Sequence, residues 1–424
     1  MLSRPNQIVF RFYVLLSSLV VFSLYNTSTA YAQKATKPLK IFILAGQSNM
    51  DGHAKISSFK HLAMDPDSKS LLTAMQDKNG LPVVCDHVWI SYAGGKNDGQ
   101  AHGKLTTGWG ARLDATKDGD KIGPEFTFGI YMEQTLHEPI LIIKTAWGGK
   151  SLHTDFRPPS AGAYKFNEQE LKKMAQKGKD VNQVKLDREK ATGRYYKKMI
   201  KHVKEVLADV GQVCPDYDPK AGYEIAGFIW FQGWNDLVAT DVYPNRGKPG
   251  GYDLYSELMA DFIHDVRKDL DAPKLPFVIG VLGVNGPVDQ FSDRQKRLKA
   301  TYSNFREAMA APADLPKFRG NVTAVLTEDF WDQELGAVAL KKGEVSRKAQ
   351  KLRKAHKGYP DQAGTISPAE QKKQVAEFHN NLFSARDREL LVGITNKEYH
   401  YLGSAKIIGE IGKAFAEAMI RMQR

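Results

Sequence analysis

Cysteine is scarce in this sequence, with only Cys85 and Cys214 among 424 residues. A small domain held together by a framework of disulfides is therefore excluded. Neither cysteine has the spacing of a metal ligand, and the sequence contains no zinc motif. In an exported protein the two could still form a single disulfide, and the sequence leaves this pairing open.

Long apolar runs are missing from the sequence after its first 32 residues. The apolar stretch 12–25 follows two arginines and precedes Ala30-Tyr31-Ala32, which is the pattern of a signal peptide cleaved after Ala32. The stretch is shorter than the roughly 20 residues of a membrane span, although a retained anchor is the alternative. We therefore predict an exported protein, periplasmic or extracellular, without stable membrane insertion after cleavage.

The charge of the chain is basic, +12 in the whole sequence and +10 once the two arginines of residues 1–32 are removed. This surplus favours an acidic polysaccharide or another anionic surface as a partner. The lysines, however, gather in the polar segments 168–190 and 341–357, which are more simply solvated helices. Neither segment interleaves aromatic residues with its charges, so we predict no nucleic-acid partner.

Short apolar strands alternate with amphipathic helices along the chain, which predicts one doubly wound, mostly parallel α/β domain. The expected strands are 39–46, 83–92, 139–146, 225–231, 276–282 and, less regular, 321–326. The expected helices are 124–137, 194–210, 254–270, 290–309 and 407–419, and a long polar loop is expected over 94–110. We expect residues 33–424 to form a single domain, with charged helical insertions near 151–190 and 335–395.

The first expected strand ends abruptly in Gly46-Gln47-Ser48-Asn49-Met50. Open α/β sheets carry their sites at the carboxyl ends of strands, so Ser48 is a candidate nucleophile. Met50 occupies the place of the second glycine of the G-x-S-x-G elbow, which excludes the α/β-hydrolase motif. An ordinary strand-to-helix turn is the alternative interpretation.

Three further turns occur where strands end or just before the last helix, at Gly148-Gly149, Gly233-Trp234-Asn235 and His400. Acyl transfer requires a hydroxyl nucleophile, an imidazole base and donors for an oxyanion. We predict Ser48 as nucleophile, His400 as base, and the N–H groups of Ser48 and Gly148 or Gly149, with the Asn235 amide, as oxyanion donors. Asn235 and Asp236 could instead cap a helix. The rival histidines are His102, His153 and His379.

These motifs resemble the SGNH hydrolase superfamily, and within it the sialate O-acetylesterase-like or carbohydrate esterase family 6 group. The matching blocks are Gly46 to Met50, Gly123-Pro124-Glu125, Thr145 to Leu152, Trp230-Phe231-Gln232-Gly233 and Tyr399-His400-Tyr401. The resemblance extends from Leu39 to the C-terminus except for the charged insertions. It implies a three-layer α/β/α sandwich with a five- or six-stranded sheet, and hydrolysis of acetyl esters on sugars without a metal or organic cofactor. Gln47, Glu125 and Gln232 are expected to support the site or to face the substrate.

The sequence departs from this family at Lys397, where an aspartate usually stands three residues before the histidine. The acid that would orient His400 must come from elsewhere, and the candidates are Glu398, Glu328, Asp329 and Asp332. We favour a Ser48–His400 dyad whose histidine is held by a backbone carbonyl or a distant carboxylate. Two other functions stay open, a catalytically inactive carbohydrate-binding relative and a lipase-like esterase for longer acyl chains.

Overall fold

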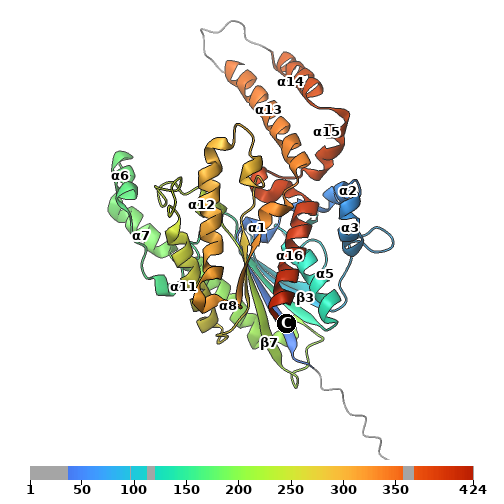
Figure 1. The fold of residues 1–424 in the computed structure, drawn as a ribbon, viewed down its shortest axis with the longest axis vertical. Helices are drawn as coiled ribbons and strands as arrows, with labels where there is room; N and C mark the ends of the chain where they lie inside the picture. The colour runs from blue at the N-terminus through green and yellow to red at the C-terminus, as the bar shows by residue number, and fades with distance from the viewer. Residues whose placement is uncertain (1–36, 96, 112–119, 357–366, 424) are drawn as a thin grey trace, which may run out of the picture. The chain divides into compact units, whose positions relative to one another are not determined.

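The computed structural model describes residues 37–95, 97–111, 120–356 and 367–423 (Figure 1). The expected signal peptide, residues 1–32, lies outside this part of the chain. Residues Lys37–Arg424 form one compact unit. Within the described ranges, no helix is both long enough and apolar enough to cross a bilayer.

A seven-stranded sheet in the order β4-β3-β6-β1-β7-β8-β9 forms the centre of the fold. Every neighbouring pair is parallel except β3 and β4. The strands of this sheet are β1 (Leu39–Gly46), β3 (Val88–Gly94), β4 (Gly99–Lys104), β6 (Ile140–Ala146), β7 (Tyr223–Phe231), β8 (Phe277–Val281) and β9 (Val322–Leu326). A separate antiparallel pair consists of β2 (Ala54–Lys55) and β5 (Lys121–Ile122). The predicted α/β class is confirmed.

Strand β4 is the strand of the central sheet that the sequence failed to predict, because we expected a loop over residues 94–110. Its sequence, GQAHGK, contains two glycines and no β-branched residue, so it carries no strand signal. It pairs antiparallel with β3 at the edge of the sheet, and its side chains alternate between half-buried and exposed. The sheet therefore has seven strands in place of the predicted five or six.

Helices cover both faces of the sheet, which gives the three layers of the predicted sandwich (Figure 1). Helices α5 and α16 pack together on one face, and α8, α11 and α12 lie on the other. The longer helices are α3 (Lys69–Met75), α5 (Pro124–Leu136), α6 (Glu168–Gln176), α7 (Val181–Ala191), α8 (Arg194–Ala208), α11 (Asp253–Asp269), α12 (Lys299–Ala310), α13 (Gln333–His356), α14 (Pro368–Leu382), α15 (Ala385–Leu390) and α16 (Ala405–Gln423). The single-turn helices are α1 (Ser48–Asp51), α2 (Phe59–Leu62), α9 (Val210–Val213) and α10 (Trp234–Leu237).

Helix α12 begins nine residues later than the expected start at residue 290. The Gln295 side chain accepts hydrogen bonds from the backbone N–H and the hydroxyl of Ser292, at 3.0 and 2.6 Å. This local turn offers the backbone an alternative to the helix, which is how serine commonly delays a helix start.

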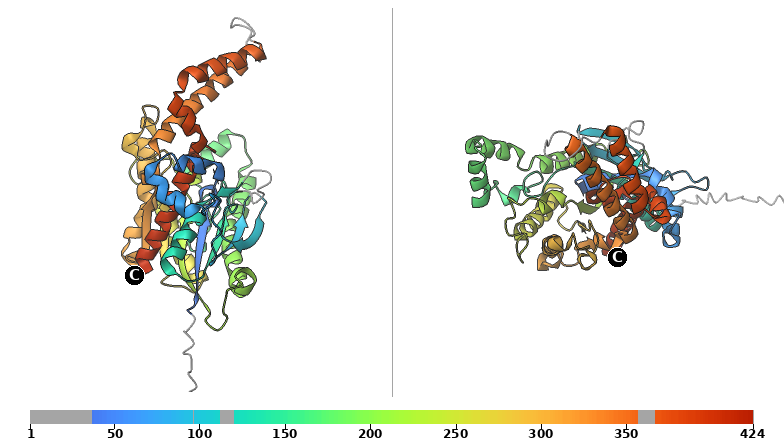
Figure 2. Two further views of the ribbon diagram at one scale, coloured as in Figure 1. Left: turned by 90° about the vertical axis from the view of Figure 1, so that its right-hand side faces the viewer. Right: turned by 90° about the horizontal axis from the view of Figure 1, so that it is seen from above.

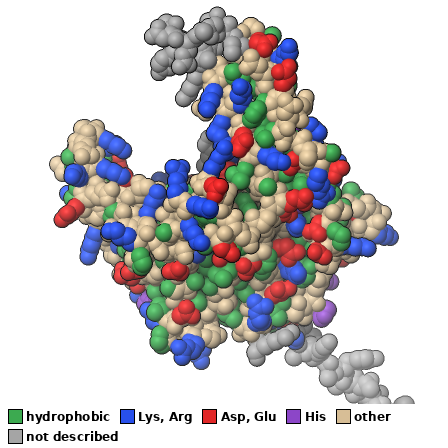
Figure 3. Space-filling view, turned by 45° about the horizontal axis from the view of Figure 1, so that its top comes forward, with side chains coloured by type: hydrophobic (Ala, Val, Ile, Leu, Met, Phe, Trp, Pro, Cys, Tyr) green, Lys and Arg blue, Asp and Glu red, His purple; other side chains and the backbone are tan. Residues whose placement is uncertain are grey.

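The two polar segments expected as insertions contain helices α6 and α7, and helices α13, α14 and α15. Helices α13 and α14 lie side by side and extend away from the sheet (Figure 2). Lysine and arginine side chains on this surface are interspersed with acids, as on solvated helices, and the surface is hollowed between the two groups of helices (Figure 3).

Both cysteines are buried free thiols, so the disulfide that the sequence left open is absent here. Burial raises the pKa of Cys214 to about 11, and it raises the pKa of Cys85 further still. Thiolates are therefore scarce at either position at neutral pH, and neither cysteine is a candidate nucleophile.

Candidate active site

The turns that carry Ser48, Gly148 and Asn235 follow three strands whose last residues are in register. Strand β1 lies between β6 and β7, and its last residue, Gly46, is in register with Ala146 and with Phe231. The chain runs to one side of β1 first and to the other side later, so this is a switch point of the sheet. Ser48, Gly148 and Asn235 therefore converge because each lies two to four residues beyond these registered ends.

Gly46 permits the tight turn that presents Ser48. A Cβ at this position would lie 2.1 Å from the carbonyl oxygen of Phe231, so only glycine fits between β1 and β7. Ser48 opens helix α1 and is 8% exposed. A Cβ on Gly148 would lie 3.7 Å from Ser48 Cβ, which places this glycine directly beside the nucleophile candidate.

Gln47 connects two of the turns through its buried side-chain amide. Its Oε1 accepts hydrogen bonds from Gln232 Nε2 and from the backbone N–H of Gly233, both at 3.1 Å. Its Nε2 donates to Asn235 Oδ1 at 3.3 Å and approaches Ser48 Oγ at 3.4 Å. Gln47 and Gln232 are each 1% exposed, so both side chains are buried next to Ser48 and Asn235.

The Asn235 amide is oriented at both of its ends. Its oxygen accepts from Gln47, and its Nδ2 donates to the carbonyl oxygen of Gly149 at 3.1 Å. The amide nitrogen carries two hydrogens, so one N–H is left for an oxyanion. Such a donor, fixed before the reaction begins, is what stabilisation of developing charge requires.

Asp236 has a role that the sequence did not reveal, since we considered it only as a helix cap. It is fully buried and accepts hydrogen bonds from the backbone N–H groups of Leu152 and His153, at 2.8 and 3.1 Å. Gln232 Nε2 and the Tyr243 hydroxyl donate to it as well. Asp236 thereby fixes the loop that follows Gly148-Gly149 to the turn that carries Asn235.

Glu125 lies beneath the nucleophile turn in a buried ion pair with Lys144, at 2.7 Å. The same Lys144 ammonium donates to the carbonyl oxygens of Asp51, the last residue of α1, and Trp109, at 2.9 and 2.7 Å. Burial raises the pKa of Glu125, an effect that Lys144 opposes, and it raises the pKa of Asp51 to about 6. Glu125 is therefore connected to helix α1 through Lys144.

His400 lies in a loop with an unusual backbone. Tyr401 and Leu402 have φ angles of +49° and +60°, a left-handed conformation that side chains disfavour. The buried Tyr401 hydroxyl anchors this loop to Gly283 N–H and Thr327 Oγ1, at 2.8 and 2.6 Å. The segment Glu398–Gly403 packs against helix α1, so the loop of His400 lies beside the turn of Ser48. Within the described residues, Ser48 Oγ and the His400 ring are not hydrogen-bonded to each other.

The contacts of His400 involve an amide and a second histidine. His400 Nδ1 lies 3.1 Å from Asn396 Oδ1, and the His400 ring is stacked on His53 with centroids 3.9 Å apart and planes 6° apart. Burial lowers the pKa of His400 to about 4. Asn396 and His53 were both missed in the sequence, which offers no pattern linking residues 53 and 396 to a histidine.

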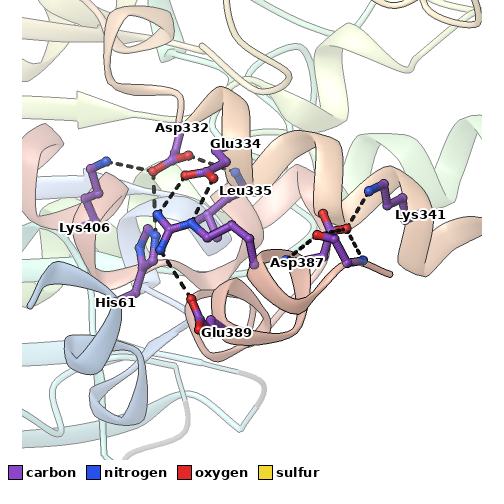
Figure 4. Close-up of polar contacts among 10 residues, drawn as sticks. His61, Asp332, Glu334, Leu335, Lys341, Asp387, Glu389 and Lys406 are labelled. Atoms are coloured by element: carbon purple, nitrogen blue, oxygen red, sulfur yellow. Dashed lines mark hydrogen bonds and ion pairs between the residues drawn. The ribbon is translucent and has the colours of Figure 1, made fainter. Parts of the chain in front are cut away.

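Among the described residues, none of the four acids that we expected as partners of His400 is hydrogen-bonded to it. Glu328 pairs with Arg306, and Asp332 pairs with Lys406 at 2.7 Å and lies 4.0 Å from His61 Nε2 (Figure 4). Glu398 is exposed, and Asp329 belongs to the same turn as Glu328. The expectation of a carboxylate or a backbone carbonyl on His400 Nδ1 was wrong, because the side-chain oxygen of Asn396 occupies that position.

The rival histidines have other surroundings. His102 is exposed on the edge strand β4, and His379 is stacked on Phe383 in helix α14. His153 is buried, with Nδ1 2.7 Å from Thr154 Oγ1. Among the described residues, no group of three histidine, cysteine or acidic side chains is arranged to hold a metal ion.

Comparison with protein families identifies the chain. The family described as "Carbohydrate esterase, sialic acid-specific acetylesterase" matches residues 38–321, about two thirds of the sequence. The chain belongs to this esterase family. The resemblance inferred from the motifs is thereby confirmed, and the protein is a carboxylic ester hydrolase of the carbohydrate esterase class.

Two solved structures are similar to this esterase. One is a protein from Arabidopsis thaliana, 18% identical with a TM-score of 0.34, over 68% of the present chain and 86% of its own. The other, a carbohydrate acetylesterase from Xanthomonas citri, is 15% identical with a TM-score of 0.36, over 69% and 51%. No curated protein matches the chain.

Proposed function

We propose that this esterase is exported and removes acetyl groups from carbohydrates by a serine–histidine mechanism. Ser48 is the nucleophile and His400 the general base. The N–H groups of Ser48 and of Gly148 or Gly149, together with Asn235 Nδ2, form the oxyanion hole. The observation that carries this proposal is the common register of the ends of β1, β6 and β7, which brings the nucleophile and the donors together.

The reaction follows from these assignments. Ser48 Oγ attacks the acetyl carbonyl carbon while its proton passes to His400 Nε2, and the oxyanion is stabilised by the N–H donors. As the tetrahedral intermediate collapses, the bond to the sugar oxygen breaks and His400 returns the proton to that oxygen. Water then attacks the acetyl-enzyme with His400 again as base, which releases acetate and restores Ser48.

A comparison of chromogenic acetyl and octanoyl esters tests the proposed activity. Acetyl ester hydrolysis with little turnover of the octanoyl ester is expected. The absence of any turnover would favour a carbohydrate-binding relative without catalysis, and preference for the octanoyl ester would favour a lipase-like enzyme. Acetate release from acetylated xylan, acetylated pectin and O-acetyl sialic acid would then define the sugar.

Asn235→Ala is expected to lower kcat by roughly 10²–10³ with little change in KM, since the oxyanion exists only in the transition state. Steady-state kinetics on the acetyl ester measure both constants. An effect confined to KM would show that Asn235 contacts the ground-state substrate, and an unchanged kcat would remove it from the oxyanion hole.

Aromatic rings beside the site support a carbohydrate substrate. Trp234 and Tyr399 directly precede Asn235 and His400, and their rings lie 5.4 Å apart at 32°. Both are half-buried and offer large apolar surface for the C–H face of a sugar ring. The surface is also hollowed between the two groups of helices α6–α7 and α13–α15, which offers room for an extended polysaccharide (Figure 3).

Trp234→Ala is expected to raise KM for an acetylated oligosaccharide about tenfold, equivalent to about 1.4 kcal/mol of lost binding. The small chromogenic acetyl ester should be hydrolysed nearly as before, because it has no sugar ring to lose contact. Tyr223→Ala is the control, since Tyr223 is an exposed aromatic at the opposite end of β7. Equal losses on both esters would show that Trp234 has no role in sugar binding.

Export is proposed from the sequence of residues 1–32 and from the absence of any later apolar run of similar length. Expression of the full chain, followed by N-terminal sequencing of the protein from the culture fluid or periplasm, tests it. A mature N-terminus near Gln33 is expected, and an intact Met1 in the membrane fraction would contradict it.

A further inference from the structure

We propose that Asn396 is the positioning residue of the general base, a neutral amide that takes the place of the carboxylate of a catalytic triad. The inference rests on the proposed function, because it assigns His400 as the base. It stands on three contacts: His400 with Asn396, Asn396 with His53, and the stacked rings of His53 and His400.

The hydrogen bonds of Asn396 determine which of its side-chain atoms is the oxygen. The backbone N–H of Lys397 donates to Asn396 Oδ1 at 2.7 Å, and a backbone N–H requires an acceptor. His400 Nδ1 lies 3.1 Å from the same oxygen, so this ring nitrogen carries the hydrogen. His400 is thereby held in the tautomer whose Nε2 is unprotonated and able to accept the proton of Ser48.

The amide nitrogen of Asn396 imposes the opposite state on His53. It lies 3.4 Å from His53 Nδ1, and because it can only donate, that ring nitrogen is an acceptor. Protonation of His53 Nδ1 would break this contact and place a cation 3.9 Å from the centre of the His400 ring. Asn396 therefore contacts both of the stacked rings, through its oxygen on the His400 side and through its nitrogen on the His53 side.

Asn396 carries no negative charge, and this affects the pKa of His400. A triad carboxylate stabilises the imidazolium by its negative charge, whereas an amide oxygen offers only a dipole. Burial, without an opposing charge, is what lowers the pKa of His400 to about 4. The segments packed against the His400 loop are α1, β2, α13 and α16. Their described acids are Asp51, Glu334, Glu344, Glu410 and Glu417, and their described bases are Lys55, Lys341, Lys342, Arg347, Lys348, Lys351, Arg353, Lys406, Lys413 and Arg421. The loop and its flanks add His53, Lys397, Glu398, Tyr399 and Tyr401. Asp51 accepts a hydrogen bond from Tyr92, Glu334 pairs with Arg386, Glu344 pairs with Arg294, Glu410 and Glu417 pair with Lys413, and Glu398 is exposed.

This geometry predicts an esterase whose base stays functional in acid. The pKa of His400 in the folded protein lies below the ordinary value of 6.5, so the neutral base persists as the pH falls towards about 4. The acid limb of the kcat/KM profile is therefore expected near pH 4, in place of the value near 6.5 of an unperturbed histidine.

Asn396→Asp provides the test, since it adds the missing charge in an isosteric side chain. The acid limb of kcat/KM for the acetyl ester is expected to move up by about one to three pH units, because a carboxylate favours the imidazolium. Asn396→Ala should lower kcat by about 10² with little change in KM, as the tautomer is no longer fixed. Coincident acid limbs for wild type and Asn396→Asp would overturn the proposal.

A second measurement decides the proposal without relying on activity. The His400 ring is titrated by NMR in the Ser48→Ala background, with and without Asn396→Asp, and the pKa is expected to rise with the aspartate. An unchanged titration would overturn the role of Asn396. Failure of the wild type to hydrolyse any acetyl ester would instead refute the proposed function, and the titration would still report on Asn396.

Two matched variants separate this effect from a general change of charge or fold. Asn182→Asp makes the same substitution on the exposed surface of helix α7 and should leave the acid limb in place. Glu398→Gln removes the carboxylate nearest His400 in sequence and should cost no more than about tenfold in kcat, well short of the ~10⁴ lost with a true triad acid. A loss of several thousandfold in Glu398→Gln would overturn the assignment of Asn396.

Discussion

Ser48→Ala is expected to lower kcat for the acetyl ester by about 10⁶, the loss on record when a serine hydrolase loses its nucleophile. A mechanism through an acetyl-enzyme has no substitute for this oxygen, because the acetyl group is carried on it. The residual activity of the variant should come from the oxyanion donors, which accelerate the direct attack of water on the ester to a small extent. Steady-state kinetics with a chromogenic acetyl ester measure the loss.

The fold should survive this change. Within the part of the chain that the structure describes, the Ser48 hydroxyl has one long contact, 3.4 Å from Gln47 Nε2, so its removal disturbs no strong hydrogen bond there. The thermal unfolding midpoint is therefore expected to stay close to that of the wild type. Ser160→Ala, at an exposed serine, is the control for the loss of a hydroxyl. Substantial activity in a pure, folded Ser48→Ala preparation would refute the nucleophile assignment.

The parts of the fold that the sequence predicted are those in which local pattern and burial agree. Strand β1 contains the unbroken apolar run Ile41 to Ala45 because it is buried between two parallel strands, and this run can be recognised from the sequence alone. Strand β4 could not be predicted from the sequence because it forms only through its pairing with β3, at an edge of the sheet where polar and glycine residues are tolerated. It is a strand because its backbone pairs with β3, since its side chains have little preference for strands.

The site likewise contains residues that could be predicted from the sequence and residues that could not. Ser48, Gly148 and Asn235 could be grouped from the sequence because parallel strands place their carboxyl ends on one side, and the strands themselves were readable. Asn396 could not be found, because its contact with His400 depends on the left-handed backbone at Tyr401 and Leu402. Tyrosine and leucine do not favour a left-handed backbone. Hydrogen bonds of the Tyr401 hydroxyl to Gly283 and Thr327 maintain it here.

Lys144→Met is expected to lower the free energy of unfolding by about 3–5 kcal/mol, the cost of breaking a buried ion pair from one side. Lys144 and Glu125 are both fully buried, so the substitution leaves the carboxylate without its counterion. The backbone oxygens of Asp51 and Trp109 lose their donor as well. Because Asp51 ends helix α1, kcat should fall together with stability.

Urea unfolding at pH 7 measures this loss, and Lys201→Met is the matched control. Lys201 pairs with Glu205 on the exposed surface of α8, where a lost ion pair should cost less than about 1 kcal/mol. The double variant Lys144→Met, Glu125→Leu removes both charges and should be more stable than Lys144→Met alone. Equal or greater instability of the double variant would show that the ion pair is not the source of the loss.

The pH dependence of Lys144→Met gives an independent check on the same cause. Burial already raises the pKa of Glu125 above 4.5, and loss of Lys144, which opposes that shift, should raise it further. Above pH 4.5 the folded variant then holds a proton that the unfolded chain releases, so its stability should fall as the pH rises through this window. Lys144→Met should therefore be less destabilised relative to wild type at pH 5 than at pH 8. A destabilisation that is the same at both pH values would mean that Glu125 is not the group left unpaired, and that the lost bonds to Asp51 and Trp109 account for the whole effect.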